Sequence, residues 1–404
     1  MIPFSPPRID EEICNAVVEA LKSGWITTGP KTKLFEKKIS EYCGVSHTLC
    51  LNSATAGLET MLRWYGVQEG DEVIIPAYTY AATANVVVHC GATPVMVDVN
   101  KEDFNISWKE IEKHINEKTK VIIPVDFAGF PADYDEIIQL VESKRHLFRP
   151  ANERQEMLGR VMILSDAAHS FGAYYKGKRT GGVCDVTVFS FHAVKNLTTA
   201  EGGAVALNLP HPFDNEEIYR YLCVHTLHGQ NKDALAKTQK GNWRYDIVEA
   251  GYKYNMTDIL ASIGLVELSR YDHDTLVKRK HIFDAYTRAF GEDEIFELPM
   301  YETKNKVSSY HVYPLRIKGI SEQQRDEIIR EIFNKDVSVN VHFIPLPMMS
   351  FYKSKGYDIN HYPAAYDNYS REISLPVFYD LKDEQIEMVI GAVKDAVKKV
   401  LSKC

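Results

Sequence analysis

Apolar and polar residues alternate in blocks through the first half of the chain, as in proteins where each strand is followed by a helix. Between residues 55 and 65, Leu58, Met61, Leu62 and Tyr65 recur at helical spacing and share one predicted face. Short apolar runs predict strands at 49–52, 72–76, 94–98, 121–125, 161–166, 186–191 and 204–207, with helices predicted at 55–65, 81–89, 107–115 and 133–142. This alternation predicts a mostly parallel central sheet flanked by helices.

The pattern changes towards the C-terminus. Strands are predicted at 310–316 and 338–343, an amphipathic helix at 322–333 and a long helix at 384–401. Helices at about 213–227 and 256–285 would bridge the two parts. We therefore expect an N-terminal arm and a large domain with bridging helices over residues 1–285, and a small C-terminal α/β domain over residues 286–404. The polar segment 142–159 is expected to be an exposed insertion.

The amino-acid composition excludes some classes of function. The chain has 404 residues, 45% of them hydrophobic and 25% charged, which is the balance of a soluble globular protein. Its net charge of −8, without blocks of like charge, argues against nucleic-acid or membrane partners. No signal peptide or membrane-spanning stretch is visible. Seven cysteines, including Cys404, form no CxxC pair, which favours the reducing cytoplasm.

Lys195 and Asp166 are the candidate catalytic residues. Lys195 lies between the predicted strands 186–191 and 204–207, where burial would lower the pKa of its amine and make it a nucleophile. Asp166 ends another predicted strand. An amine that forms a Schiff base with an aldehyde, and a carboxylate beside a pyridinium nitrogen, are what pyridoxal phosphate needs from a protein. Taken alone, however, most lysines are solvated, and Asp166 could simply cap a loop.

Other polar and aromatic residues also follow predicted strands, where ligands of parallel sheets bind. Ser53 and Thr55 begin a helix and could bind an anion, or act as an ordinary N-cap. Ser190 could reach a phosphate. Tyr78 and Tyr80 could stack on a flat heterocycle or pack in the core, and His169 could be a core histidine.

Three other site types are not supported. The segment 172–179 has P-loop spacing but ends in Arg179, where a Ser or Thr would bind Mg²⁺. No GxGxxG fingerprint occurs. His225 and His228 lack further ligands at metal spacing, so we expect no metal site.

Seven motifs together carry a resemblance to a known family. They are Ser23-Gly-Trp-Ile-Thr-Thr-Gly-Pro30, Asn52-Ser-Ala-Thr55, Pro76-Ala-Tyr-Thr-Tyr-Ala-Ala-Thr-Ala-Asn85, Asp166-Ala-Ala-His-Ser170, Ser190-Phe-His-Ala-Val-Lys195 with the following Thr198-Thr-Ala-Glu-Gly-Gly203, Gly251-Tyr-Lys-Tyr-Asn-Met-Thr-Asp258 and Val341-His-Phe343. The chain resembles the nucleotide-sugar aminotransferases of the DegT/DnrJ/StrS type, a branch of the fold-type I pyridoxal phosphate-dependent transferases, over nearly its whole length.

The resemblance implies roles for individual residues. Lys195 would bind the cofactor covalently and later move a proton between cofactor and substrate, and Asp166 would pair with the pyridine nitrogen. The remaining cofactor contacts would be Ala54, Thr55 and Ser190 at the phosphate, Tyr80 stacked on the ring, His169 at the ring hydroxyl, and Lys253 and Asn255, which would reach the partner's phosphate site across a homodimer interface. Trp25, Thr28, His228 and His342 are expected to contact the substrate.

The expected reaction is transfer of an amino group from an amino acid, L-glutamate, to C4 of a nucleotide-diphosphate keto-sugar. The segments Gly251–Asn255 and Ser190–Asn196 are similar to those of the UDP-4-amino-4-deoxy-L-arabinose aminotransferase subgroup. Asp126 stands where the family usually has His. Two alternatives remain: a pyridoxal phosphate-dependent sugar dehydratase, whose relatives carry His in place of Lys195, or a non-catalytic regulatory member of the fold.

Overall fold

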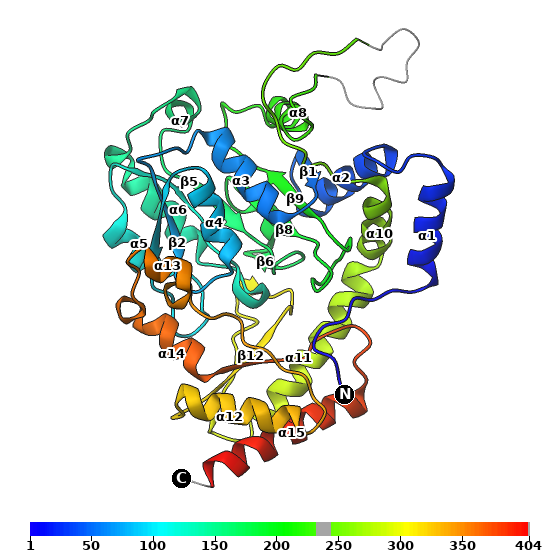
Figure 1. The fold of residues 1–404 in the computed structure, drawn as a ribbon, viewed down its shortest axis with the longest axis vertical. Helices are drawn as coiled ribbons and strands as arrows, with labels where there is room; N and C mark the ends of the chain where they lie inside the picture. The colour runs from blue at the N-terminus through cyan, green and yellow to red at the C-terminus, as the bar shows by residue number, and fades with distance from the viewer. Residues whose placement is uncertain (232–243, 403–404) are drawn as a thin grey trace.

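The computed structural model describes residues 1–231 and 244–402, and its largest feature is a seven-stranded sheet (Figure 1). The strand order is β1-β9-β8-β5-β4-β2-β3. Only β9 runs antiparallel to its neighbours, so the predicted α/β class with a mostly parallel sheet is confirmed. The strands are β1 (His47–Leu51), β2 (Glu72–Pro76), β3 (Thr93–Val97), β4 (Thr119–Ile122), β5 (Met162–Asp166), β8 (Val186–Ser190) and β9 (Gly203–Leu207).

Alternate residues of the central strands enter different cores, as strand geometry requires. Val186 and Val188 of β8 pack in the core that Leu58 of helix α3 also enters, whereas Phe189 packs in the core that contains Phe35 of α2. The helices around the sheet are α1 (Glu11–Lys22), α2 (Pro30–Cys43), α3 (Ala54–Tyr65), α4 (Ala81–His89), α5 (Trp108–His114), α6 (Tyr134–Ser143), α7 (Glu153–Leu158), α8 (Asn215–His225) and α10 (Asp258–Ser269).

A second unit lies below the large sheet in Figure 1. Its antiparallel sheet has the order β10-β12-β13, and its core takes side chains from α11 and also Ile2 from the start of the chain. The predicted boundary between residues 285 and 286 falls inside α11 and stays a prediction. The elements of this second unit are α11 (Leu276–Phe290), β10 (Phe296–Glu297), β12 (Tyr313–Ile317), α12 (Glu322–Phe333), β13 (Glu372–Leu375) and α15 (Asp383–Leu401). The helices α13 (Ser350–Ser354) and α14 (Pro363–Arg371) instead contribute side chains to the core of the large unit, and a small sheet β11-β6-β7 (Lys306–Val307, Tyr174–Tyr175, Lys178–Arg179) joins the two units.

The strand predicted at 338–343 is wrong. Its backbone makes one isolated bridge, from Asn340 to Ser374, and a single bond from Ser338 N–H to the Ile2 carbonyl, but no continuous ladder. Beyond that point, His342 N–H donates to the Glu372 carboxylate at 3.1 Å, and Tyr78 OH donates to the His342 carbonyl at 2.5 Å. Side chains thus satisfy the backbone polar groups that a sheet partner would otherwise bond.

Two further predictions need correction. The bridging helix predicted at 256–285 is two helices, because a π-turn at Tyr271–Thr275 separates α10 from α11. The segment 142–159 is not simply an exposed insertion. It contains α7, and its apolar residues Phe148 and Leu158 are buried in the core of the large unit.

None of the helices in residues 1–231 and 244–402 is both long and apolar enough to cross a membrane. Six of the seven cysteines lie in these two ranges, and all six are free thiols. Cys404 lies outside the described residues. The same ranges contain no cluster of His, Cys, Asp and Glu side chains suited to a metal ion.

A buried ion pair fixes the start of β5. Both terminal nitrogens of the Arg160 guanidinium donate to the Asp185 carboxylate, at 2.7 and 2.8 Å, and Ile163 N–H donates to it at 2.9 Å. Asp185→Ala would leave the guanidinium buried with the half-exposed Glu142 as its remaining carboxylate partner. We expect the free energy of unfolding, measured by urea denaturation, to fall by about 3–5 kcal/mol.

The exposed Asp395, which pairs with Lys335 at 2.6 Å, provides the matched control. Solvent screens that pair, so Asp395→Ala should leave the urea midpoint unchanged. Equal effects from the two substitutions would contradict the assignment of a stabilising role to the buried pair.

Candidate functional site

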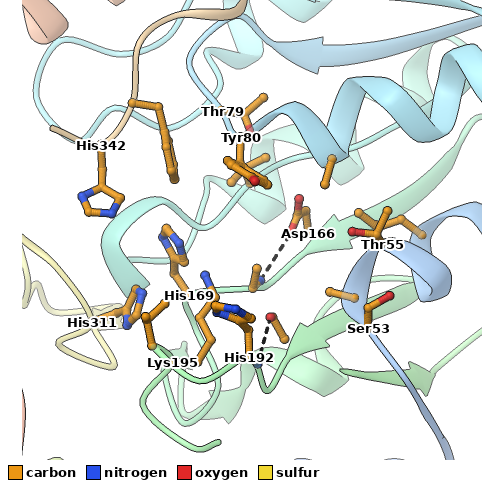
Figure 2. A pocket seen from close by; sticks show the side chains of 18 of the residues that line it. Ser53, Thr55, Thr79, Tyr80, Asp166, His169, His192, Lys195, His311 and His342 are labelled. Atoms are coloured by element: carbon orange, nitrogen blue, oxygen red, sulfur yellow. Dashed lines mark hydrogen bonds between the residues drawn. The ribbon is translucent and has the colours of Figure 1, made fainter. Parts of the chain in front are cut away.

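A cavity of about 350 Å³ opens at the carboxyl ends of the central strands. Figure 2 shows its side chains converging from the loops that follow β1, β2, β5 and β8 and from the C-terminal unit. Eight of the residues predicted from the sequence line it: Ala54, Thr55, Tyr80, Asp166, His169, Ser190, Lys195 and His342.

Lys195 enters the cavity from the loop after β8. A turn fixes the backbone there, with Lys195 N–H donating to the His192 carbonyl at 2.9 Å. Burial lowers the pKa of the Lys195 amine to about 8, although the negative charge of Asp166 opposes this shift. The amine is therefore closer to its neutral, nucleophilic form than an ordinary lysine is.

Asp166 is the last residue of β5 and is 6% exposed. Burial raises the pKa of its carboxyl group, and hydrogen bonds from Thr83 Oγ1 at 2.8 Å and Ala168 N–H at 3.2 Å oppose the shift, as does the charge of Lys195. Thr83 is a contact of Asp166 that was not predicted from the sequence. Its place on α4 in the motif that starts at Pro76 was the one available signal.

Three histidines surround the lysine: His169, His311 and His342. Burial holds the pKa of His169 and His311 well below the usual histidine value and lowers that of His342 to about 4. All three rings are therefore neutral at pH 7. A second positive charge beside Lys195 is thereby avoided.

His311 and Phe343 were not predicted as site residues, although both line the cavity. The Asn196 side chain donates from Nδ2 to the Ser309 carbonyl at 2.6 Å, so its Oδ1 faces His311 Nδ1 at 2.7 Å. Since an amide oxygen can only accept, His311 carries its proton on Nδ1, and Nε2 is left as an acceptor. His311 falls inside the strand predicted at 310–316, where a buried polar residue has no distinctive pattern.

The start of α3 forms one end of the cavity. Ser53 is its N-cap, with Oγ accepting from Ala56 N–H at 3.1 Å, while Ala54 and Thr55 line the cavity. A Cβ at position 203 would lie 2.5 Å from the nitrogen of Ala54, so the close approach of β9 requires glycine. First-turn N–H groups and the helix dipole favour an anion at this place.

The tyrosines after β2 have different roles. Tyr78 is fully buried and packs against Phe104 and Phe127, so the packing interpretation holds for this residue. Tyr80 is 65% exposed and lines the cavity, with its ring 5.9 Å from that of Phe343.

Five predicted site residues do not line the cavity of this chain: Trp25, Thr28, His228, Lys253 and Asn255. Asn255 Nδ2 donates to Thr28 Oγ1 at 2.6 Å, and an isolated backbone bridge joins Lys253 to Leu227, the neighbour of His228. Four of the five are therefore held together along the segment 251–256. Their contact with cofactor or substrate stays a prediction.

The groups around the cavity fit a cofactor with an aldehyde, a protonated ring nitrogen and a phosphate. A lysine of lowered pKa, a buried carboxylate at a strand end and a helix N-terminus face one space. These are the protein groups that pyridoxal phosphate requires. The fold and the site together define the class of pyridoxal phosphate-dependent transferases.

Residues 7–394 match the model of the DegT/DnrJ/EryC1/StrS aminotransferase family, and the chain belongs to this family. The putative sugar aminotransferase Spr1654 from Streptococcus pneumoniae, solved in apo, PLP and PMP forms, is 47% identical in the PMP form, with a TM-score of 0.96 over 99% of this chain and 100% of that one. The spore coat polysaccharide biosynthesis protein SpsC of Bacillus subtilis is 33% identical, over 98% of this chain and 97% of its own.

A third similar protein is PseC of Helicobacter pylori, an aminotransferase involved in the biosynthesis of pseudoaminic acid. It is 29% identical, with a TM-score of 0.85, over 98% of this chain and 99% of its own. The predicted family, the enzyme class and the cofactor, pyridoxal phosphate, are thereby confirmed. The arabinose subgroup is not specifically supported by these similarities.

Proposed function

We propose that this enzyme transfers an amino group from L-glutamate to C4 of a keto-sugar linked to a nucleotide diphosphate, for use in polysaccharide biosynthesis. The observation that carries the proposal is one cavity in which Lys195 and Asp166 face a helix N-terminus. The similarity to SpsC supports a role in polysaccharide biosynthesis, and the similarity to Spr1654 supports a sugar substrate.

Each cavity residue has a defined task in this proposal. Bound pyridoxal phosphate supplies an electron sink that stabilises negative charge on the carbon next to the transferred nitrogen. Lys195 Nζ binds the cofactor and then carries the proton between the two carbons that exchange hydrogen. Asp166 keeps a proton on the ring nitrogen by its negative charge.

The other residues bind and orient. Ala54, Thr55 and Ser190 hold the phosphate at the start of α3, Tyr80 covers the ring, and His169 contacts the ring hydroxyl. His342 contacts the sugar. Lys253 and Asn255, with Trp25, Thr28 and His228, act on the cavity of a second copy in a homodimer, which accounts for their absence from the cavity of their own chain.

The two alternatives are disfavoured by particular residues. The sugar dehydratases of this fold carry His in place of the lysine, whereas Lys195 is present here and enters the cavity. A regulatory member would have no need of a lysine with lowered pKa opposite a buried carboxylate, and this chain has both.

A transamination assay tests the proposal. The purified protein, loaded with pyridoxal phosphate, is incubated with L-glutamate and a panel of UDP-, dTDP- and GDP-linked 4-keto-hexoses and 4-keto-pentoses. We expect 2-oxoglutarate and one amino-sugar to form in equal amounts, with nitrogen at C4 located by NMR. Amination at C3, or dehydration without 2-oxoglutarate, would contradict the proposal.

The pH dependence of cofactor uptake tests the state of Lys195. With a pKa of about 8, about a tenth of the amine is neutral at pH 7, against about one part in 2,500 for an ordinary lysine. Deprotonation creates the nucleophile, so the rate at which cofactor-free protein takes up pyridoxal phosphate, followed by visible absorbance, should rise about tenfold per pH unit up to about pH 8 and then level off.

Asp166→Asn is the control for this profile. The charge of Asp166 raises the pKa of Lys195, so its removal should shift the break in the profile to lower pH. A rate that keeps rising to the ordinary lysine pKa would contradict the lowered pKa of Lys195.

A further inference from the structure

The first residues of the chain form an extended segment, which we call the N-terminal strap (residues 2–8), that is fixed at both ends. At its first end, Ile2 N–H donates to the Asp336 carbonyl at 2.7 Å, and Ser338 N–H donates to the Ile2 carbonyl at 3.0 Å. The Ile2 side chain is 4% exposed and belongs to the core of the C-terminal unit. In Figure 1 the N-terminus lies near α11 and α15 accordingly.

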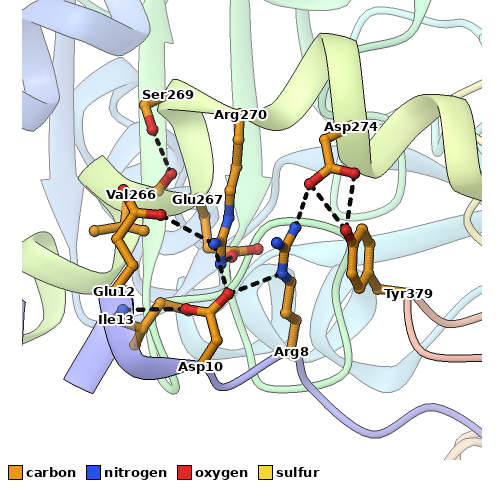
Figure 3. Close-up of polar contacts among 10 residues, drawn as sticks. All are labelled: Arg8, Asp10, Glu12, Ile13, Val266, Glu267, Ser269, Arg270, Asp274 and Tyr379. Atoms are coloured by element: carbon orange, nitrogen blue, oxygen red, sulfur yellow. Dashed lines mark hydrogen bonds and ion pairs between the residues drawn. The ribbon is translucent and has the colours of Figure 1, made fainter.

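At its second end, Arg8 is held by charges and by a ring (Figure 3). Its guanidinium donates to Asp274 at 2.7 Å and to Asp10 at 3.1 Å, and lies 3.7 Å from the centre of the Tyr379 ring. Arg270 donates to the same Asp10 carboxylate at 2.6 Å. These contacts tie the strap to the turn between α10 and α11.

Between the two ends, the strap touches two residues that line the cavity. The Phe4 ring stacks on the His342 ring, with centroids 5.5 Å apart and planes inclined by 22°. Ser5 Oγ donates to the carbonyl of Val194, the neighbour of Lys195, at 3.3 Å. Phe4 and Ser5 do not themselves line the cavity, so both act from behind its wall.

The composition of the strap makes it stiff. Pro3, Pro6 and Pro7 fix the backbone angle φ at three of its seven positions. A short segment with restricted φ and fixed ends has few conformations to lose, so Phe4 is held in place at low entropic cost.

His342 is held by a hydrogen bond and by contacts with neighbouring rings. Its Nδ1 is 2.9 Å from Ser374 Oγ, which in turn donates to Glu372, so one edge of the imidazole is fixed. The stacked Phe4 ring packs against one face. The rings of Phe343 and His169 also lie near the imidazole, at 5.1 and 6.5 Å, but both are edge-to-face. Phe4 supplies the stacked contact, and without it the imidazole would be free to tilt about its fixed edge.

We propose that the strap is a positioning element for the acceptor substrate, in which Phe4 holds the imidazole of His342 against the cavity. The proposal rests on the proposed function, because it needs His342 to contact the keto-sugar. Phe4 is thus a positioning residue that acts through His342, and Ile2 and Arg8 anchor it.

Steady-state kinetics of four variants test this role. Phe4→Ala and Phe4→Leu should raise KM for the keto-sugar about five- to tenfold, with kcat and KM for the amino donor within about twofold. Phe4→Tyr keeps the flat ring and should behave as the wild type. Leucine preserves apolar volume, so it keeps the test valid if the alanine variant fails to fold. Ile9→Ala, at an exposed residue next to the strap, is the control and should change nothing.

A double-substitution cycle separates action through His342 from general loosening. In a His342→Ala background, Phe4→Ala should have no further effect on KM. Additive effects, an unchanged KM in Phe4→Leu, or equal losses in Phe4→Leu and Phe4→Tyr would overturn the proposal.

A measurement that needs no turnover tests the contact between the strap and His342 independently of the proposed function. Diethyl pyrocarbonate modification of His342, quantified by peptide mass spectrometry against the exposed His146, should be several-fold faster in Phe4→Leu and unchanged in Phe4→Tyr. If the wild type aminates no keto-sugar, the proposed function fails. If Phe4→Leu leaves the modification rate unchanged, the strap's hold on His342 fails.

Discussion

Lys195→Ala should reduce turnover by about 10⁵-fold or more, to the background of the assay, because in the proposed mechanism one amine both binds the cofactor and carries the proton. The two roles fall on one atom, Nζ, which enters the cavity opposite Asp166. The measurement is formation of 2-oxoglutarate from L-glutamate with the keto-sugar that the wild type accepts.

Lys178→Ala is the matched control, since Lys178 is an exposed lysine on β7 outside the cavity. It should retain full activity. A small primary amine added to Lys195→Ala should restore part of the rate, because a free amine can carry the proton. Near-normal activity of Lys195→Ala without added amine would end the proposed mechanism.

Much of the fold could be predicted because the large unit obeys simple periodicities. The predicted helix at 81–89 and the predicted strand at 72–76 coincide with α4 and β2. The predicted strand at 338–343 is wrong because side chains, and not a continuous backbone ladder, form the hydrogen bonds at the end of that segment. At 338–343, Val339 is buried and the run is strand-like, yet its pairing with β13 stops after Asn340. At His342 the Glu372 carboxylate and the Tyr78 hydroxyl bond the backbone instead.

The site residues that could be predicted from the sequence are those that directly follow predicted strands. Lys195 and Asp166 each follow an apolar run, and the short motifs around them together indicated their chemical roles. Thr83, His311 and Phe4 could not be found in this way. Each acts by contacting a residue more than 80 positions away in the chain, and neither hydrophobic periodicity nor short motifs report such contacts.

Lys195 and Asp166 are both buried, and burial disfavours the charged form of each side chain. Burial lowers the pKa of Lys195 and raises that of Asp166, so it opposes charge on each, and their mutual attraction offsets part of the cost. Ionisable groups that burial makes unfavourable are typical of active sites, because function and stability make opposite demands on them. Because function and stability make opposite demands on Asp166, one substitution there should change activity and stability in opposite directions.

Asp166→Asn should reduce turnover by about 10²–10³-fold while the folded protein is at least as stable as the wild type. Asparagine keeps the size of the side chain but removes the negative charge that, in the proposed mechanism, holds a proton on the ring nitrogen. Because the folded-state pKa of Asp166 is raised, the ionised carboxylate destabilises the fold once the pH exceeds the ordinary aspartate value. A neutral amide removes that penalty at pH 7. Turnover and the urea midpoint of the cofactor-free protein are the two measurements.

Thr83→Val separates the charge from the hydrogen bond. It removes the donor at 2.8 Å from the Asp166 carboxylate but leaves the charge in place. Turnover should therefore fall less than about tenfold, because the negative charge beside the ring nitrogen remains. If the two substitutions lowered turnover equally, or if Asp166→Asn unfolded at lower urea than the wild type, the carboxylate would be a structural anchor for the end of β5, and its role at the ring nitrogen would have to be given up.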